Sequence, residues 1–183
     1  MNLEILPVSV IDIGAQKKRK NEDHNSKSSR ASYSPFPEEI AKLCYEFYLR
    51  NSTDIFDPFA GWGERHFFAK QYNKNYVGYD ISQKALDMAK KEYDVINILA
   101  DSRDAIIAEF DGFITCPPYW NLEKYDSKKG IDKEKSWIDF LGEYTGILFR
   151  SYDVAKSGAT FCIMVGDWRK NHIYYDLTYH TNR

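Results

Sequence analysis

Between residues 35 and 165 the chain alternates between two hydrophobic patterns. Short apolar runs, typical of strands, occupy 54–57, 76–80, 95–100, 112–115 and 159–165. Apolar residues at helical spacing predict helices after Pro37, through 67–69, after Ser82, around 106–107 and over 137–152. Strands that alternate with helices predict an α/β fold, a mostly parallel sheet with helices on both faces. The run 159–165 is apolar throughout, as expected of a buried parallel strand.

The first 32 residues follow neither pattern. Residues 3–13 are apolar enough for an edge strand, but 15–32 are polar and rich in lysine, with nothing to bury. We therefore expect an N-terminal segment and polar linker over 1–32, followed by one folded domain over 33–183.

Composition excludes several classes of protein. The chain of 183 residues is 43% hydrophobic and 28% charged, which indicates a soluble globular protein. Its apolar runs are too short to cross a membrane, and its start does not resemble a signal peptide. Three widely spaced cysteines predict neither a disulfide framework nor a metal site, and favour a reducing cytoplasm. The net charge of −2 gives no global attraction to nucleic acid, so phosphate contacts would need local basic groups: Lys124, Lys128, Lys129, Lys133, Arg169 and Lys170.

The first strand ends in a glycine-containing loop, Asp57-Pro58-Phe59-Ala60-Gly61-Trp62-Gly63. Two glycines separated by one residue allow a sharp turn and a close approach of the backbone to a ligand. A dinucleotide-binding loop would need a third glycine at position 66, where this chain has His66. Nicotinamide and flavin enzymes are therefore disfavoured.

Two acids follow the next two strands. Asp80, about twenty residues after the glycine loop, can accept hydrogen bonds from ribose hydroxyls. Asp101, followed by Ser102, can accept from an adenine amino group. Each acid also fits the simpler role of a helix cap.

The fourth strand ends in Cys116-Pro117-Pro118-Tyr119. Two prolines fix the backbone and remove two N–H donors, which leaves a rigid loop of carbonyl acceptors. Such a loop suits an amino group on a flat base, and the Tyr119 ring can stack on that base. The alternative is a proline turn with packed aromatic residues.

The combined pattern from 34 to 181 resembles the amino-methylating DNA methyltransferases, which act at N4 of cytosine or N6 of adenine. Ser34-Pro35-Phe36-Pro37 resembles the family segment near the methionine part of the cofactor. The resemblance implies a Rossmann-like methyltransferase fold, S-adenosylmethionine as cofactor, and a target base flipped out of DNA. It implies catalytic roles for Cys116, Pro117, Pro118 and Tyr119. The implied cofactor-binding residues are Pro35, Phe36, Asp57, Phe59, Gly61, Gly63, Asp80, Ile81, Asp101 and Ser102. It also implies a cytoplasmic protein of a prokaryote or a phage.

The chain departs from the family in two places. Cys116 stands where the family has Asp, Asn or Ser. Because Cys resembles Ser in size, and Ser is commoner at this position among enzymes that methylate cytosine N4, the resemblance slightly favours cytosine as the target. The closing C-terminal strands of the family fold are not visible. Either the chain is shortened, or a homodimer partner or second subunit supplies the rest, including target recognition.

Three alternatives stay open. An RNA methyltransferase would share a proline-proline-aromatic loop. A non-catalytic module would keep the fold and bind cofactor, nucleic acid or a partner. A cysteine nucleophile of the cytosine-C5 type would need Pro-Cys, whereas this chain has Cys-Pro.

Overall fold

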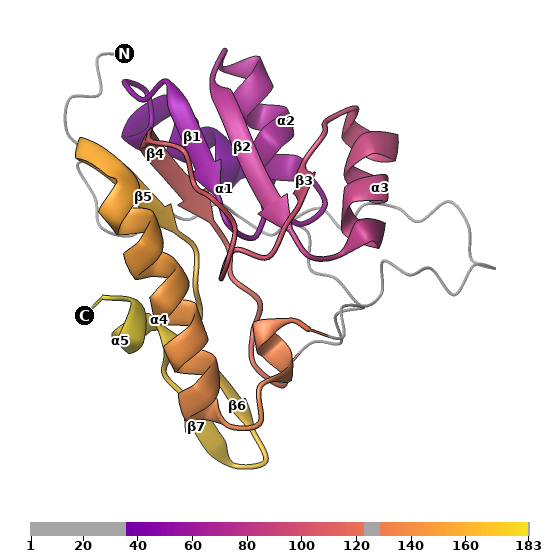
Figure 1. The fold of residues 1–183 in the computed structure, drawn as a ribbon, viewed down its shortest axis with the longest axis vertical. Helices are drawn as coiled ribbons and strands as arrows, with labels where there is room; N and C mark the ends of the chain where they lie inside the picture. Colours follow the sequence, from indigo (N-terminus) through magenta and orange to yellow (C-terminus); the bar gives the residue numbers. More distant parts are fainter. Residues whose placement is uncertain (1–35, 123–128, 183) are drawn as a thin grey trace.

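The centre of the molecule is a five-stranded parallel sheet (Figure 1). The computed structural model describes residues 36–122 and 129–182. The strand order is β3-β2-β1-β4-β5. The strands are β1 (Asp54–Asp57), β2 (Asn75–Asp80), β3 (Ile98–Leu99), β4 (Phe110–Thr115) and β5 (Ala155–Ile163). The predicted parallel sheet is confirmed.

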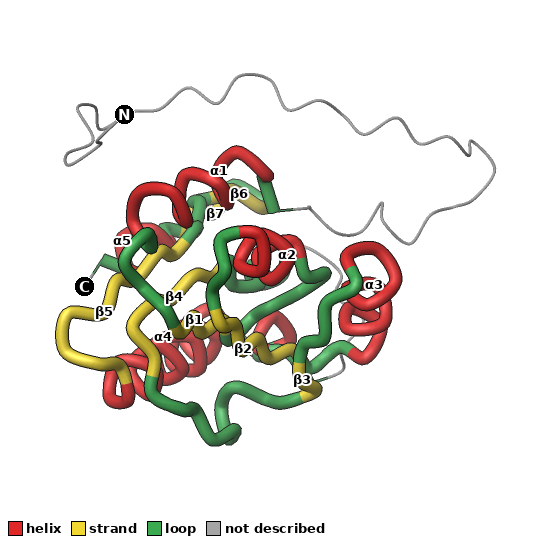
Figure 2. The backbone as a smooth tube through the Cα atoms, turned by 90° about the horizontal axis from the view of Figure 1, so that it is seen from above, coloured by secondary structure: helices red, strands yellow, loops and turns green. Residues whose placement is uncertain are grey.

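Helices cover both faces of this sheet, as the sequence predicts (Figure 2). One face carries α1 (Glu38–Leu43), α2 (Glu64–Gln71) and α3 (Gln83–Tyr93). A π-helical turn, η2 (Cys44–Tyr48), continues α1. The other face carries α4 (Trp137–Val154), which a short 3-10 helix, η3 (Ile131–Lys133), precedes. None of the helices in the described residues is long and apolar enough to cross a membrane.

The starts of the two longest helices follow from local capping. The Ser82 hydroxyl accepts a hydrogen bond from the N–H of Ala85 at the start of α3, as expected. Ser136 does the same for Asp139 at the start of α4. Because each cap satisfies a free N–H, it fixes the residue at which its helix begins.

The apolar run in β1 reflects burial on both sides of the sheet. Ile55 packs in the cluster under α1 and α2, with Tyr45 and Ile114. Phe56, the next residue, packs in the cluster on the α4 side, with Phe113. Successive side chains of a strand point to opposite faces, so a strand covered on both faces must be apolar at every position.

Three predicted elements differ in the structure. β3 contains only Ile98 and Leu99, and Ile96 within the predicted run is 72% exposed. No helix forms at Ile106, which is 90% exposed in a stretch without regular structure. β5 begins at Ala155, and none of its residues is fully buried, because it is the last strand of the sheet.

After β5 the chain forms an antiparallel hairpin that was not predicted. It comprises β6 (Trp168–Lys170) and β7 (Ile173–Tyr175), a two-stranded sheet separate from the main one, and a short α5 (Leu177–Thr181) follows. In the part of the chain that the structure describes, no strand pairs with the outer edge of β5 in the main sheet. The predicted edge strand at 3–13 and the linker at 15–32 lie outside the described residues.

Candidate active site

The predicted site residues follow adjacent parallel strands. The glycine loop follows β1, Asp80 ends β2, and Cys116 follows β4. β1 pairs with β2 on one side and with β4 on the other, so the sheet order reverses between β1 and β4. The carboxyl edge at such a reversal is where open α/β sheets bind ligands.

Asp57 is the centre of a buried hydrogen-bond network. Its carboxylate is fully buried, and its Oδ1 accepts from the Thr115 hydroxyl at 2.6 Å and from the Phe59 N–H at 3.0 Å. Its Oδ2 accepts from Arg65 Nε and from the Tyr76 hydroxyl, both at 2.6 Å. The network joins β1, β2, β4 and α2. Asp57 therefore positions the glycine loop, and any contribution to cofactor binding would be indirect.

Arg65 connects this network to the segment before α1. Its Nη2 donates to the Phe59 carbonyl at 2.5 Å. Its guanidinium carbon lies 4.8 Å from the ring centroid of Phe36, a cation–π contact that places this predicted cofactor residue beside the glycine loop. Pro35 lies outside the described residues.

The two glycines differ in what surrounds them. Both have positive φ, +58° at Gly61 and +91° at Gly63. A Cβ on Gly61 would meet only the Phe59 carbonyl, in ordinary van der Waals contact at 3.9 Å. A Cβ on Gly63 would lie 2.7 Å from Val95 Cγ2 and 2.8 Å from Ala89 Cβ. Gly61 is therefore the glycine with room beside it for a ligand, whereas Gly63 allows α2 to pack closely on α3.

Asp80 holds the glycine loop from the neighbouring strand. Its Oδ2 accepts from the Gly61 N–H and its Oδ1 from the Ser82 N–H, each at 2.8 Å. Burial raises the pKa of the Asp80 carboxyl above its usual value, and the bonds from Ser82 and Gly61 oppose this rise. Each oxygen keeps a lone pair for a further donor, so the carboxylate fits the predicted role of holding ribose hydroxyls.

The residues after β2 and β3 are tied to neighbouring elements. Asp101 binds Arg103 through both oxygens, and this contact lowers the pKa of the Asp101 carboxyl. The Ser102 hydroxyl is buried and donates to the Pro58 carbonyl at 2.7 Å. Ile81 is half-buried. An adenine amino group would therefore have to share Asp101 with Arg103, and the contact of Ser102 is with the glycine loop.

The loop after β4 is held by β5 and by the hairpin. The Thr115 carbonyl accepts from the Met164 N–H at 2.9 Å, just before Cys116. The ring of Tyr119 meets that of Trp168 edge to face, with centroids 5.2 Å apart. Cys116, Pro118 and Tyr119 are half-buried and Pro117 is buried. The loop is thus firmly positioned, with its first and last residues partly open.

One aromatic cluster brings the two loops together. Phe59 of the glycine loop and Tyr119 both pack against the buried residues of this cluster, which include Tyr144 and Trp168. The structure therefore places the predicted cofactor loop and the predicted base-binding loop at one site.

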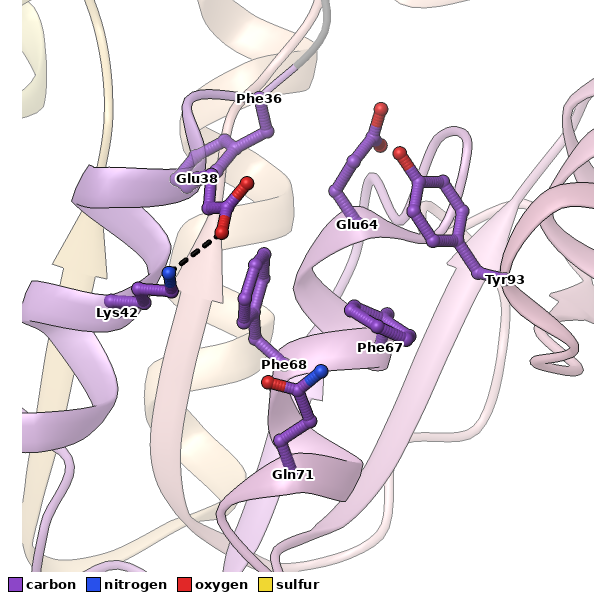
Figure 3. A pocket seen from close by; sticks show the side chains of 8 residues that line it. All are labelled: Phe36, Glu38, Lys42, Glu64, Phe67, Phe68, Gln71 and Tyr93. Atoms are coloured by element: carbon purple, nitrogen blue, oxygen red, sulfur yellow. Dashed lines mark ion pairs between the residues drawn. The ribbon is translucent and has the colours of Figure 1, made fainter.

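A separate pocket of about 290 Å³ lies on the face that carries α1 and α2 (Figure 3). It is lined by Phe36, Glu38, Lys42, Glu64, Phe67, Phe68, Gln71 and Tyr93. Glu38 and Lys42 form an ion pair at its rim, 2.6 Å apart. Phe36 is itself a predicted cofactor residue, and Glu64 directly follows Gly63, so the pocket adjoins the predicted site residues at two points.

The sequence missed Thr115, Arg65 and Tyr76, which satisfy Asp57. Their signal is weak, because each is a common residue type and only the fold brings them together. In the residues that the structure describes, no group of His, Cys, Asp or Glu could hold a metal ion.

The strand order and the site at the reversal define the class: this is an α/β Rossmann-like fold, shared with the solved structure that it resembles. The PH0226 protein of Pyrococcus horikoshii has a similar structure, with a TM-score of 0.54 and 21% identity over 80% of this chain and 58% of that one. An O-methyltransferase of a Brevibacillus brevis trans-AT PKS multienzyme, solved with S-adenosyl-L-homocysteine, has a TM-score of 0.49 and 11% identity over 73% and 44%. The chain spans about half the length of these proteins. No curated protein matches it.

Residues 9–91 match a family model described as DNA methylase. The resemblance to the amino-methylating DNA methyltransferases is thereby confirmed over a segment that contains the glycine loop and Asp80. The cofactor of this fold and family is S-adenosylmethionine, as expected. The match ends before Asp101 and before the loop that begins at Cys116.

Proposed function

We propose that this protein transfers a methyl group from S-adenosylmethionine to the exocyclic amino group of cytosine or adenine in DNA. The observation that carries the proposal is the meeting of the glycine loop and the Cys116–Tyr119 loop at one aromatic cluster. The match of residues 9–91 to DNA methylases supports DNA as the substrate.

The cofactor side would be held by backbone and carboxylate groups. A Cβ on Gly61 would meet no atom closer than 3.9 Å, and Asp80 would accept hydrogen bonds from the ribose hydroxyls. When bound, the cofactor supplies an electrophilic methyl group. Phe36, which makes a cation–π contact with Arg65, would lie beside the methionine part of the cofactor.

The base side would use acceptors and stacking. An exocyclic amine is a weak nucleophile because its lone pair is conjugated with the ring. The carbonyl of Pro117 and the side chain of Cys116 would accept its two N–H groups, which favours a tetrahedral nitrogen with an available lone pair. Tyr119 would stack on the ring of the flipped base. Catalysis would then consist of positioning and electrostatics.

Cys116 is the weakest part of this arrangement. A thiol accepts hydrogen bonds less well than a hydroxyl or a carboxylate. The Pro117 carbonyl would therefore carry more of the interaction than in an enzyme with Asp at this position.

The proposal is tested by methyl transfer from labelled cofactor to DNA, with Tyr119→Ala as the diagnostic variant. Base–aromatic stacking contributes about 1–3 kcal/mol, so turnover should fall roughly tenfold to a hundredfold while cofactor affinity stays unchanged. Tyr152→Ala, which changes a 70% exposed tyrosine on α4, is the matched control and should keep full activity. Equal turnover in the two variants, or transfer to RNA in preference to DNA, would refute the proposal.

A further inference from the structure

The β6–β7 hairpin presents two different faces. Its register pairs Trp168 with Tyr175 and Arg169 with Tyr174. The first pair is buried and stacked, with ring centroids 5.2 Å apart. The second pair is exposed, and the Arg169 guanidinium lies 5.5 Å from the centroid of the Tyr174 ring. Because side chains alternate along a strand, three residues a strand suffice to separate an inner from an outer face.

The inner face is attached to the loop that would hold the base. Trp168 packs edge to face on Tyr119. Lys170 donates to the carbonyl of Asn121 and, at 2.9 Å, to its side-chain oxygen. Asn121 lies two residues after Tyr119. The hairpin therefore contacts the base-binding loop directly, through Trp168 and Lys170.

The outer face and the tip are suited to an anionic surface. Arg169 is the cation of the outer face, because Lys170 lies on the inner face and donates to Asn121. The two carboxylates that flank the hairpin have partners of their own: Asp167 accepts from Tyr174 and Thr178, and Asp176 lies 3.5 Å from His180. Ile173 and Tyr174 are 56% and 54% exposed. The turn residues Asn171 and His172 have positive φ, which makes a tight turn that holds the tip in a defined shape. The hairpin lies beyond the ends of β1 and β2 to which their arrows point, on the side of the candidate site (Figure 1).

We propose that this hairpin is a DNA-binding element, in which Arg169 contacts a backbone phosphate beside the base held by Tyr119. The inference rests on the proposed function, since DNA is the substrate it assumes. Arg is well suited to this contact because its planar donors match phosphate oxygens. The Tyr174 ring makes a cation–π contact with the Arg169 guanidinium, and Asp167 accepts a hydrogen bond from the Tyr174 hydroxyl at 2.7 Å.

The test uses the full chain and a fluorescein-labelled DNA duplex, with affinity measured by anisotropy over a series of NaCl concentrations. Arg169→Ala should weaken binding and reduce the slope of log K against log salt by about 0.9, the value for one lost phosphate contact. Arg169→Lys should restore most of the slope, because it keeps the charge. Lys91→Ala, which removes an exposed cation from the last turn of α3, should leave the slope unchanged. Thermal unfolding of each variant verifies that the fold is intact.

The outcomes separate the two proposals. Equal slopes for Arg169→Ala and Lys91→Ala, or no binding of the duplex by the wild type, would overturn the hairpin inference. A stronger dependence on Arg169 for an RNA duplex than for DNA would also overturn it. If the slope depends on Arg169 while labelled methyl transfer to DNA is absent, the hairpin inference stands and the proposed function fails. If methyl transfer occurs and the slope does not change, the reverse holds.

Discussion

Asp57→Asn should strongly destabilise the protein. The substitution removes the negative charge from a fully buried carboxylate and leaves the Arg65 guanidinium, itself only 6% exposed, without its counter-charge. The new amide would also place an N–H donor where every neighbouring group now donates to the carboxylate. These donors are Arg65 Nε, the Tyr76 hydroxyl, the Thr115 hydroxyl and the Phe59 N–H. Breaking a buried ion pair by removing one partner costs about 3–5 kcal/mol.

The same strand supplies a matched control. Asp54, at the other end of β1, pairs with Lys156 at 2.8 Å, but the two side chains are 38% and 41% exposed. An exposed pair contributes about 0–1 kcal/mol, so Asp54→Asn should change stability little. The two variants make the same chemical change in one strand and differ mainly in burial.

Urea unfolding at pH 7, followed by circular dichroism, measures both losses. The midpoint should fall sharply for Asp57→Asn and slightly for Asp54→Asn, with unchanged m-values. A loss below about 1 kcal/mol for Asp57→Asn, or one equal to that of Asp54→Asn, would refute the view that Asp57 holds three strands together.

Three further predictions concern the site itself. Gly61→Ala should weaken cofactor binding, measured by calorimetry, and should lower stability by about 1–2 kcal/mol because of the positive φ. Gly63→Ala should lower stability more, because its Cβ would also collide with Val95. A larger loss of stability for Gly61→Ala than for Gly63→Ala would contradict this. Asp80→Asn should weaken cofactor binding by about 1.5–3 kcal/mol. Because the charged carboxylate binds and its pKa is raised, wild-type affinity should fall with decreasing pH sooner than for an ordinary aspartate, and a pH-independent affinity would argue against the role. Cys116→Ser should keep or raise turnover and Cys116→Ala should lower it; abolition by both would indicate a cysteine nucleophile.

The sequence predicts the sheet well where burial is two-sided. β1 has the predicted bounds, since Ile55 and Phe56 face opposite layers and both must be apolar. The apolar runs predict the bounds and burial of the two edge strands, β3 and β5, less well. β3 is shorter than predicted because Ile96 does not pair with β2, and β5 is only half-buried. The hairpin was missed because three-residue strands that pair only with each other leave too short a pattern.

The site shows a similar division. The rule for parallel sheets correctly predicts that the residues after β1, β2 and β4 meet at one edge. It cannot predict what each carboxylate binds. Asp57 ends β1 and Asp101 follows β3, yet the first is bound by buried donors and the second pairs with the half-buried Arg103. Asp80 is half-buried and bonds the Gly61 N–H, so it lies beside the glycine loop, as the sequence suggests.

The central claim is tested most directly by mass spectrometry of nucleosides from DNA incubated with the wild-type protein and isotopically labelled S-adenosylmethionine. The account predicts labelled N4-methylcytosine or N6-methyladenine. Labelled 5-methylcytosine, or unmodified DNA from a protein that still binds the cofactor, would contradict it.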